Sequence, residues 1–408
     1  MERQVTSAPH GHILTNCNVW SPDGRRLVYD VRSDPAGDVF DGDRIETVDV
    51  ETGEVRALYE SRNGAQCGVA TYHPTANRVV FILGPEYPIA EFSYGAARRR
   101  GVMVDEDRPN VAVALDARDL TPPFTPGALR GGSHVHVFSA DGRFVSFTYE
   151  DHVLTTGSGE VNQRNVGVSV LGHAVRVPGT HLRNHDGEAF TVLVTRTVDR
   201  PRPGSDEISK AFEDAWLGTG RRAIAFQGHV VTPAGDTISE VFIVELPDDL
   251  TVPGDGPLEG TATTRPRPPK GTVQRRLTYT SDRRYPGLQG PRHWLRSSPD
   301  GSRIAFLMRD DRGVVQLWTV APTGGEPVQV TANDADIGSA FTWSPDGRSI
   351  AHTMGGRLCV TDVAAGSTTA VAGPARPEAC VFSPDGRRIA FVRTVGGFNQ
   401  VFVADLLQ

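Results

Sequence analysis

The chain has 408 residues, a formal net charge of −7 and 38% hydrophobic residues. This length can bury a large core, and the negative balance argues against nucleic acid as the main partner. No apolar run approaches the roughly 20 residues that span a bilayer, and the N-terminus lacks the apolar stretch of an export signal. We therefore expect a cytoplasmic protein without a membrane partner.

One phrase recurs along the chain. Residues 20–29 read WSPDGRRLVY, and residues 382–391 read FSPDGRRIAF. Pro-Asp-Gly favours a tight turn, and the apolar residues on both sides predict two buried strands joined by it. The Ser or His before the turn stands at Ser21, His73, Ser139, Ser298, Ser344 and Ser383. Repetition at a few dozen residues is typical of a propeller or a solenoid.

The long gap between Ser139 and Ser298 predicts one further unit with an insertion. Residues 188–194 read as its inner strand, and residues 222–226 and 240–246 read as its later strands. Residues 199–220 interrupt this pattern, and residues 206–216 within them predict a short helix with Ser205 as its N-cap. The total is then seven units.

We therefore predict an all-β, seven-bladed β-propeller that forms a single domain over residues 1–408. The first residues, Arg3 to Thr6, resemble the segments that close earlier units, so they are expected to supply the outer strand of the last blade and close the ring. The expected blades span about 8–60, 61–125, 126–180, 181–280, 281–333, 334–373, and 374–408 with 1–7.

Polar residues recur just before the turn phrases, near one mouth of the expected central channel. Residues from several blades in the same phase can converge on one ligand at the axis. The positions five and three before the turn Ser hold Asn16, Asn18, His134, His136, His293 and Glu378. Arg284 and Tyr285 belong to the Gly-rich segment before His293 and join Asn16, Asn18 and Glu378 as candidate substrate-binding residues.

His134-Val135-His136 is the sharpest local pattern. Residues two apart on a strand face the same side, and His293 has the same phase in another blade, so three imidazoles could bind Mn, Zn, Fe or Ni. The alternative is that these histidines only pack and hydrogen-bond among the inner strands. Gln66 and His12 are weaker additional ligands. The remaining histidines considered, at turn, surface or packing positions, are His10, His73, His152, His173, His229 and His352.

Two arginines and one further histidine are candidates for chemistry. Arg130 and Arg292 precede the histidine positions and could neutralise a carboxylate, although solvated loop arginines would look the same. His185 opens the fourth expected blade and could act as a general base near the axis, although the sequence shows no partner for it.

The repeat phrase resembles the TolB-type propeller repeat, and the chain as a whole resembles a bacterial propeller family related to oligogalacturonate lyases. The most specific stretch is Arg130-Gly131-Gly132-Ser133-His134-Val135-His136. The resemblance implies a seven-bladed propeller that binds manganese through histidines and a glutamine, here His134, His136, His293 and Gln66, and cleaves short uronate oligomers by β-elimination. Gly131 stands where the lyases have a ligand glutamine, so this chain departs from their spacing.

Three functions follow from these observations. The first is a metal-dependent lyase that acts on a small acidic, sugar-derived molecule in the central channel. The second is a non-catalytic propeller that binds a ligand or protein at the channel mouth. The third keeps the metal but isomerises or dehydrates a metabolite.

Overall fold

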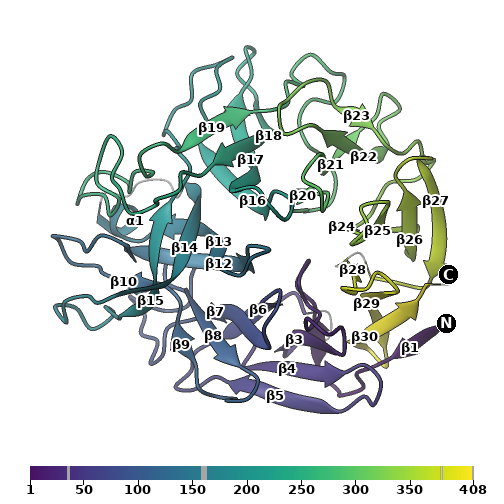
Figure 1. The fold of residues 1–408 in the computed structure, drawn as a ribbon, viewed down its shortest axis with the longest axis horizontal. Coiled ribbons are helices and arrows are strands. Elements are labelled where there is room, and N and C mark those ends of the chain that lie inside the picture. The colour runs from purple at the N-terminus through teal and green to yellow at the C-terminus, as the bar shows by residue number, and fades with distance from the viewer. Residues whose placement is uncertain (35–36, 158–162, 377, 379, 407–408) are drawn as a thin grey trace.

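The computed structural model describes residues 1–34, 37–157, 163–376, 378 and 380–406. In this part of the chain, seven four-stranded antiparallel sheets stand around a central axis, and the chain runs once around the ring (Figure 1). The expected all-β, seven-bladed propeller is thereby confirmed. Among the same residues, no helix is long and apolar enough to cross a membrane.

The first four blades have longer inner strands than the last three. Blade 1 consists of β2 (Gly11–Ile13), β3 (Arg26–Arg32), β4 (Arg44–Asp49) and β5 (Val55–Glu60). Blade 2 consists of β6 (Cys67–Tyr72), β7 (Arg78–Leu83), β8 (Arg100–Asp105) and β9 (Val113–Ala114). Blade 3 consists of β12 (Gly131–Phe138), β13 (Phe144–Asp151), β14 (Arg164–Val175) and β15 (Gly187–Leu193). Blade 4 consists of β16 (Lys210–Trp216), β17 (Ala223–Val231), β18 (Thr237–Glu245) and β19 (Val273–Arg276).

The last three blades have short inner strands. Blade 5 consists of β20 (Arg296–Ser297), β21 (Ile304–Arg309), β22 (Val315–Val320) and β23 (Val328–Gln329). Blade 6 consists of β24 (Thr342–Trp343), β25 (Ser349–Met354), β26 (Arg357–Asp362) and β27 (Ser367–Ala372). Blade 7 consists of β28 (Val381–Phe382), β29 (Arg388–Val395), β30 (Phe398–Asp405) and β1 (Glu2–Gln4). Outside the blades lie the parallel pair β10 (Ala117–Arg118) and β11 (Ala128–Leu129), and helix α1 (Val153–Gly157).

Each turn phrase is held by its own side chains. In blade 1 the Ser21 hydroxyl donates to Asp23 at 2.6 Å and accepts from the Arg26 backbone N–H at 2.8 Å. Gly24 has φ +67°, a conformation that favours glycine. The same Ser–Asp hydrogen bond recurs in blades 3, 5, 6 and 7, which explains why this short phrase marks the repeat.

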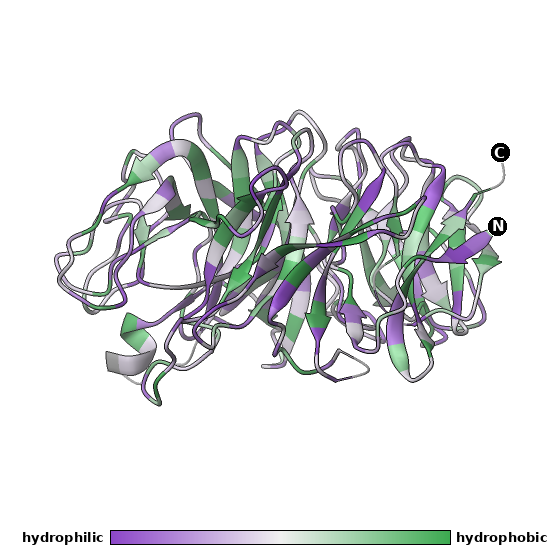
Figure 2. Cartoon of the chain, turned by 90° about the horizontal axis from the view of Figure 1, so that it is seen from below, coloured by the Kyte–Doolittle hydropathy of each residue, from purple (hydrophilic) through white to green (hydrophobic). Residues whose placement is uncertain are grey.

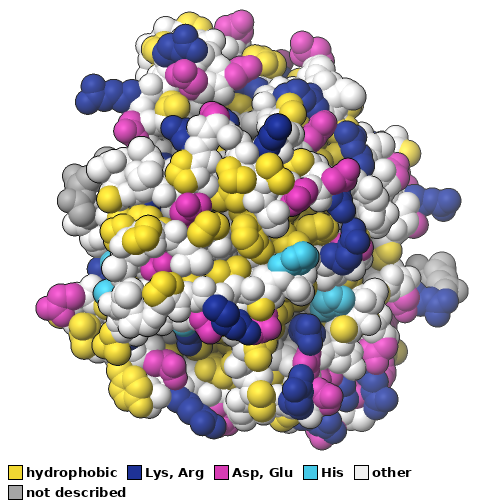
Figure 3. Space-filling model, turned by 60° about the vertical axis from the view of Figure 1, so that its left-hand side comes forward, with side chains coloured by type: hydrophobic (Ala, Val, Ile, Leu, Met, Phe, Trp, Pro, Cys, Tyr) yellow, Lys and Arg dark blue, Asp and Glu magenta, His cyan; other side chains and the backbone are white. Residues whose placement is uncertain are grey.

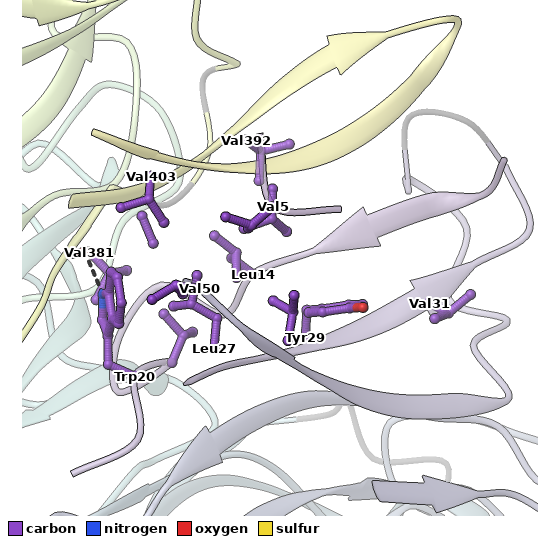
Figure 4. Packing of buried hydrophobic residues seen from close by; sticks show 14 residues of the cluster. Val5, Leu14, Trp20, Leu27, Tyr29, Val31, Val50, Val381, Val392 and Val403 are labelled. Carbon is purple, nitrogen blue, oxygen red and sulfur yellow. Dashed lines mark hydrogen bonds between the residues drawn. The ribbon is translucent and has the colours of Figure 1, made fainter. Parts of the chain in front are cut away.

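The N-terminal strand closes the ring as expected. β1 pairs with β30, with Arg3 opposite Val403, so blade 7 is built from both ends of the chain. Valines of blade 7 then pack against blade 1, where Val5 and Leu14 lie beneath Val392 and Val403 (Figure 4). Such packing between neighbouring sheets forms the core of the ring. Figure 2 shows the hydrophobic residues concentrated on the strands and the hydrophilic ones along the connecting loops.

Two sequence-based assignments in the fourth expected blade are wrong. Residues 188–194 do not form its inner strand, because β15 pairs with β14 as the outer strand of blade 3. Residues 210–216 are not helical, because β16 pairs with β17 and is itself the inner strand of blade 4. β14 is 12 residues long, so its partner β15 lies farther along the chain than the repeat length suggests. Tertiary strand pairing overrides the local helix signal here.

Candidate functional site

The inner strands of blades 2, 3 and 4 each contain a β-bulge. The register shifts between Gly68 and Thr71, between His134 and Val137, and in the corresponding part of β16. At each bulge one residue has positive φ: Val69 at 59°, Val135 at 55° and Glu213 at 53°. A bulge re-aims the side chains that follow it, so residues two apart no longer face one side as they do in a regular strand.

One hydrophobic cluster brings together residues of several blades near the axis. Cys17, Val135 and Val137 form one buried cluster, and it is completed by partly buried residues from other blades, namely Val69, Trp216 and Trp294. Residues of blades 1 to 5 can share a cluster only where the blades converge. The axis at this level is therefore packed by hydrophobic side chains.

Each of the three histidines expected to bind a metal contacts a neighbouring group, the backbone for His134 and His293 and a hydroxyl for His136. His293 Nδ1 lies 2.9 Å from the Pro291 carbonyl, and its Nε2 accepts from the Leu307 N–H at 3.1 Å. His134 Nδ1 lies 3.2 Å from the Thr148 carbonyl. Among the described residues, these histidines do not belong to a group of three or more metal-ligating side chains within 4.8 Å of one another.

The ring of His136, unlike those of His134 and His293, has a side chain of its own blade as its hydrogen-bond partner. Its Nε2 lies 3.0 Å from the Ser133 hydroxyl, and its ring lies 5.9 Å from that of Phe147 within the same blade. The positive φ of Val135 separates the directions of His134 and His136. The fourth expected ligand, Gln66, is half-buried just before β6, and its Oε1 is buried without a partner.

The arginines expected to meet a substrate are paired internally. Arg130 is fully buried, forms an ion pair with Asp151 at 2.9 Å and donates to the Thr264 carbonyl at 2.8 Å. Arg292 donates to Glu213 at 2.8 Å, and its side chain is otherwise exposed. Arg130 is therefore not available to a ligand.

The five expected substrate-binding residues do not converge either. Asn16 accepts a hydrogen bond from Arg296 of blade 5, which helps to close the axis. Asn18 has φ +51°, and its carbonyl accepts from Tyr72. The others are held locally: Arg284 donates to the Asp311 carbonyl and lies 5.4 Å over the Tyr285 ring, and Glu378 pairs with Arg376 at 3.4 Å.

One sequence-predicted residue, His185, lies in a pocket at the junction of blades 2 and 3. The pocket has a volume of about 350 Å³ and is formed by the β7–β8 loop, by β10 and by the segment before β15. β10 and β15 lie at the outer edge of the ring (Figure 1). Figure 3 shows this side of the molecule, where histidine reaches the surface among basic, acidic and hydrophobic side chains.

Four arginines line this pocket against one glutamate: Arg98, Arg100, Arg118 and Arg183 against Glu86. Arg118 is only 3% exposed and donates to the carbonyls of Arg98 and Arg99. Burial lowers its pKa to about 10, with the nearby Arg100 adding to the effect and Asp116 opposing it. A guanidinium remains charged at that pKa, so the pocket carries excess positive charge.

A strained loop forms one wall of the pocket. Arg183 donates to the carbonyls of Glu86 and Tyr87, at 2.6 and 2.8 Å. Tyr87 itself has φ +47°, a conformation that an aromatic residue rarely adopts. Strain of this kind persists where surrounding contacts impose it, often beside a ligand site.

His185 is held in one tautomer at the pocket. Its backbone pairs with that of Arg118 through two hydrogen bonds, and its Nδ1 lies 3.1 Å from the Asp186 carbonyl. A carbonyl accepts only, so Nδ1 carries the proton and Nε2 keeps its lone pair. Nε2 is buried without a partner. Burial, followed by the charges of Arg118 and Arg100, lowers the pKa of His185 well below 6.5, so the ring is neutral.

A second cluster of polar side chains lies in blade 1. The ligand atoms of His10, His12 and Glu46 lie within 4.8 Å of one another. The sequence analysis treated His12 only as a weaker ligand and placed His10 among turn, surface or packing residues. The signal that could have found them is the His-Gly-His spacing at residues 10–12, but Glu46 comes from another strand and carries no signal of its own.

The pocket arginines were also missed by the sequence analysis. Arg98, Arg100 and Arg118 lie outside the repeat phrase, in the β7–β8 loop, at the start of β8 and on β10. The run Arg98-Arg99-Arg100 was the available signal. The fold and this pocket define a seven-bladed β-propeller with a basic pocket at the junction of blades 2 and 3.

The chain belongs to the family of YidR. It is 48% identical over 398 residues to the uncharacterized protein YidR of Escherichia coli (strain K12), and the match covers 96% of this chain and 94% of that protein. A family described as "Protein of unknown function (DUF3748)" matches residues 66–185. All residues that line the pocket fall inside this segment.

Solved structures share the whole architecture. An oligogalacturonate lyase in complex with manganese has a TM-score of 0.60 at 13% identity and covers 100% of this chain and 93% of its own. An oligogalacturonate lyase from Vibrio parahaemolyticus has a TM-score of 0.57 at 10% identity, with 100% and 94% covered. At these identities the likeness shows the fold alone. The expected relation to the lyase-type propeller is confirmed at that level.

Proposed function

We propose that the pocket at the junction of blades 2 and 3 binds the carboxylate of a small acidic, sugar-derived molecule and that His185 removes a proton from it. The observation that carries this proposal is the buried, unpartnered Nε2 of a neutral His185 in a pocket lined by four arginines. The lyase-type fold supports the same class of substrate.

The charges of the pocket favour a carboxylate. Arg100 lies 3.7 Å from Glu86, a distance too long for a strong ion pair, and both side chains are partly exposed. A bound carboxylate can accept two parallel N–H bonds from a guanidinium, which gives it both affinity and orientation. Binding would also offset the positive charges that hold down the pKa of His185 and would make that ring a stronger base.

The rim of the pocket suits the apolar ring face of a sugar. Three large hydrophobic side chains are exposed there: Tyr87 at 69%, Ile89 at 53% and Leu182 at 89%. Exposed apolar groups that border polar ones mark ligand-binding grooves. A uronate has both an apolar ring face and a carboxylate. Its ring face would pack on the exposed apolar side chains while its carboxylate binds the arginines.

The chemistry is a β-elimination. Nε2 of His185 takes the proton from the carbon next to the carboxylate, and the arginines stabilise the charge that develops on the carboxylate oxygens. The electron pair then forms a carbon–carbon double bond as the bond from the β-carbon to the leaving oxygen breaks. That oxygen takes a proton from water, and the hydroxide that remains takes the proton from Nε2 and restores the neutral His185. One molecule of substrate yields one unsaturated product and one alcohol.

No step of this proposal uses a metal. The related lyase structure contains manganese, but the donor set expected here from the resemblance does not fit such an ion. Both ring nitrogens of His293 already bond the backbone, and Nε2 of His136 lies at hydrogen-bond distance from the Ser133 hydroxyl. These local bonds favour the second candidate function, a propeller that binds an acidic ligand without converting it.

The experiment is a panel of galacturonate oligomers and other uronates, assayed for ultraviolet absorbance of the new double bond and for product mass. Turnover supports the elimination. Saturable binding without product supports the non-catalytic alternative and refutes the catalytic role of His185. Absence of binding to every acidic sugar overturns the proposal as a whole.

A further inference from the structure

The closure of the ring contains three metal-ligating side chains that the proposed function does not use. His10 precedes β2, His12 lies on β2, and Glu46 lies on β4. Their ligand atoms lie within 4.8 Å of one another. Among the described residues, no other group of three or more histidine, cysteine, aspartate or glutamate side chains meets this distance.

His12 is prepared to donate a lone pair. It is fully buried, and its Nδ1 lies 2.8 Å from the carbonyl of Asn399 in β30. Since a carbonyl can only accept, Nδ1 carries the proton and Nε2 is free to bind an ion. Nε2 of His12 and Nδ1 of His10 are both buried without a hydrogen-bond partner. Buried polar atoms nearly always have a partner, so these two unpaired nitrogens indicate a ligand site.

Glu46 supplies the negative charge. Its Oε2 accepts from the Tyr29 hydroxyl at 2.9 Å, and its Oε1 lies 3.8 Å from Nε of Arg44. A carboxylate offers about four lone-pair positions, so these two contacts leave room for an ion. The Tyr29 hydroxyl holds the carboxylate in place, as groups behind a metal ligand commonly do.

The cluster lies where both ends of the chain meet. The segment between β1 and β2 runs along β30: the Gln400 amide donates to the Ala8 carbonyl, and the Thr6 hydroxyl donates to Gln400. The hydrophobic side of the same junction is shown in Figure 4, with Tyr29 lying among Leu14 and Leu27. An ion held by His10, His12 and Glu46 would join this segment to β4 of blade 1.

We propose that His10, His12 and Glu46 bind one divalent first-row transition-metal ion within blade 1, beside its contact with β30 of blade 7. Two imidazoles and one carboxylate suit Zn²⁺, Mn²⁺ or Fe²⁺, whereas Mg²⁺ and Ca²⁺ prefer oxygen ligands alone. The ion stabilises the folded protein because its three ligands, on β4, on β2 and just before β2, come together only when blade 1 has formed.

The experiment measures metal content and metal-dependent stability of the full chain, purified without a chelator or a nickel column. After chelator treatment and dialysis, Zn²⁺ or Mn²⁺ alone is titrated in, and the melting temperature is followed. We expect about one ion per chain and a rise in melting temperature. In His12→Ala and Glu46→Gln the affinity should fall by more than roughly 100-fold, since even groups behind the ligands contribute 10- to 100-fold.

Two controls separate this site from others. His352 is equally buried, but both its nitrogens have partners, Thr353 and Thr361, so His352→Ala lowers stability without changing metal affinity. His134→Ala tests the axial histidines and should also keep the ion. The proposal is overturned if neither ion raises the melting temperature of the wild-type chain, or if His134→Ala loses the metal while His12→Ala keeps it. Because the readout is metal content, the result does not depend on uronate binding.

Discussion

The central axis and the junction of blades 2 and 3 use the same kinds of residues in opposite ways. At the axis, His293 and Arg292 are tied to neighbouring groups, and hydrophobic side chains fill the space between the blades. At the junction, His185 keeps a free nitrogen and Arg100 has only a distant partner. The repeated positions near the axis therefore serve packing, whereas the proposed site is built from residues outside the repeat phrase at the junction of two blades.

The largest expected effect concerns the base at the junction. His185→Gln should lower turnover of an acidic substrate by roughly 100- to 10,000-fold, the usual contribution of a general base, while binding changes little. Steady-state kinetics and calorimetric titration measure the two quantities. His173→Gln, at an exposed position elsewhere in blade 3, is the control and should behave as wild type. Equal losses in both variants would remove His185 from the chemistry.

The next effect concerns ligand affinity. Arg183→Ala should weaken binding of a uronate by about 10- to 100-fold, because the substitution removes one pocket charge and frees the loop at Glu86 and Tyr87. Arg292→Ala, at an exposed arginine that pairs with Glu213 of the inner strand β16, should leave affinity unchanged. If the Arg292 variant is the one that loses binding, the site is at the inner strands.

The axial histidines should matter for stability alone. His293→Ala leaves the buried Leu307 N–H without its acceptor and should lower the free energy of unfolding by about 1–3 kcal/mol. Urea-induced unfolding measures this loss. Uronate affinity should stay within about twofold of wild type, since a stability change of this size leaves the chain folded. A large loss of affinity in a chain that remains folded would contradict the comparison between the two regions.

The smallest effect is a pH dependence. The pKa of His185 lies well below 6.5, so kcat/KM should change little from about pH 8 to pH 6.5 and fall only at lower pH. The unfolded chain binds a proton at this histidine below about pH 6.5, whereas the folded chain does not, so stability also falls as the pH is lowered through that range. A pH profile with its midpoint at or above 6.5 would contradict the buried, neutral ring.

The turn phrase alone was sufficient to predict the architecture. Each copy encodes its own Ser–Asp hydrogen bond and a glycine turn, so strand, turn and strand follow from local chemistry. The all-β class and the seven blades followed from that repetition, the closure of the ring followed from the likeness of residues 3–6 to segments that end earlier blades, and all three are confirmed. The inner strand of blade 4 was misplaced and a helix was expected where β16 lies, because the pairing of the long β14 has no local signal.

The sites depended on tertiary structure. The bulge at Val135 turns His136 away from His134, and nothing in the residue pattern predicts a positive φ at a valine. The basic pocket joins Arg98 and Arg118 to His185 across two blades, and Glu46 meets His10 and His12 across two strands. A repeating sequence determines which strands form, because the hydrogen bonds and turn conformations that favour each strand pair lie within a few residues of one another. Which side chains remain unpaired is decided only when separate segments pack together and desolvate one another.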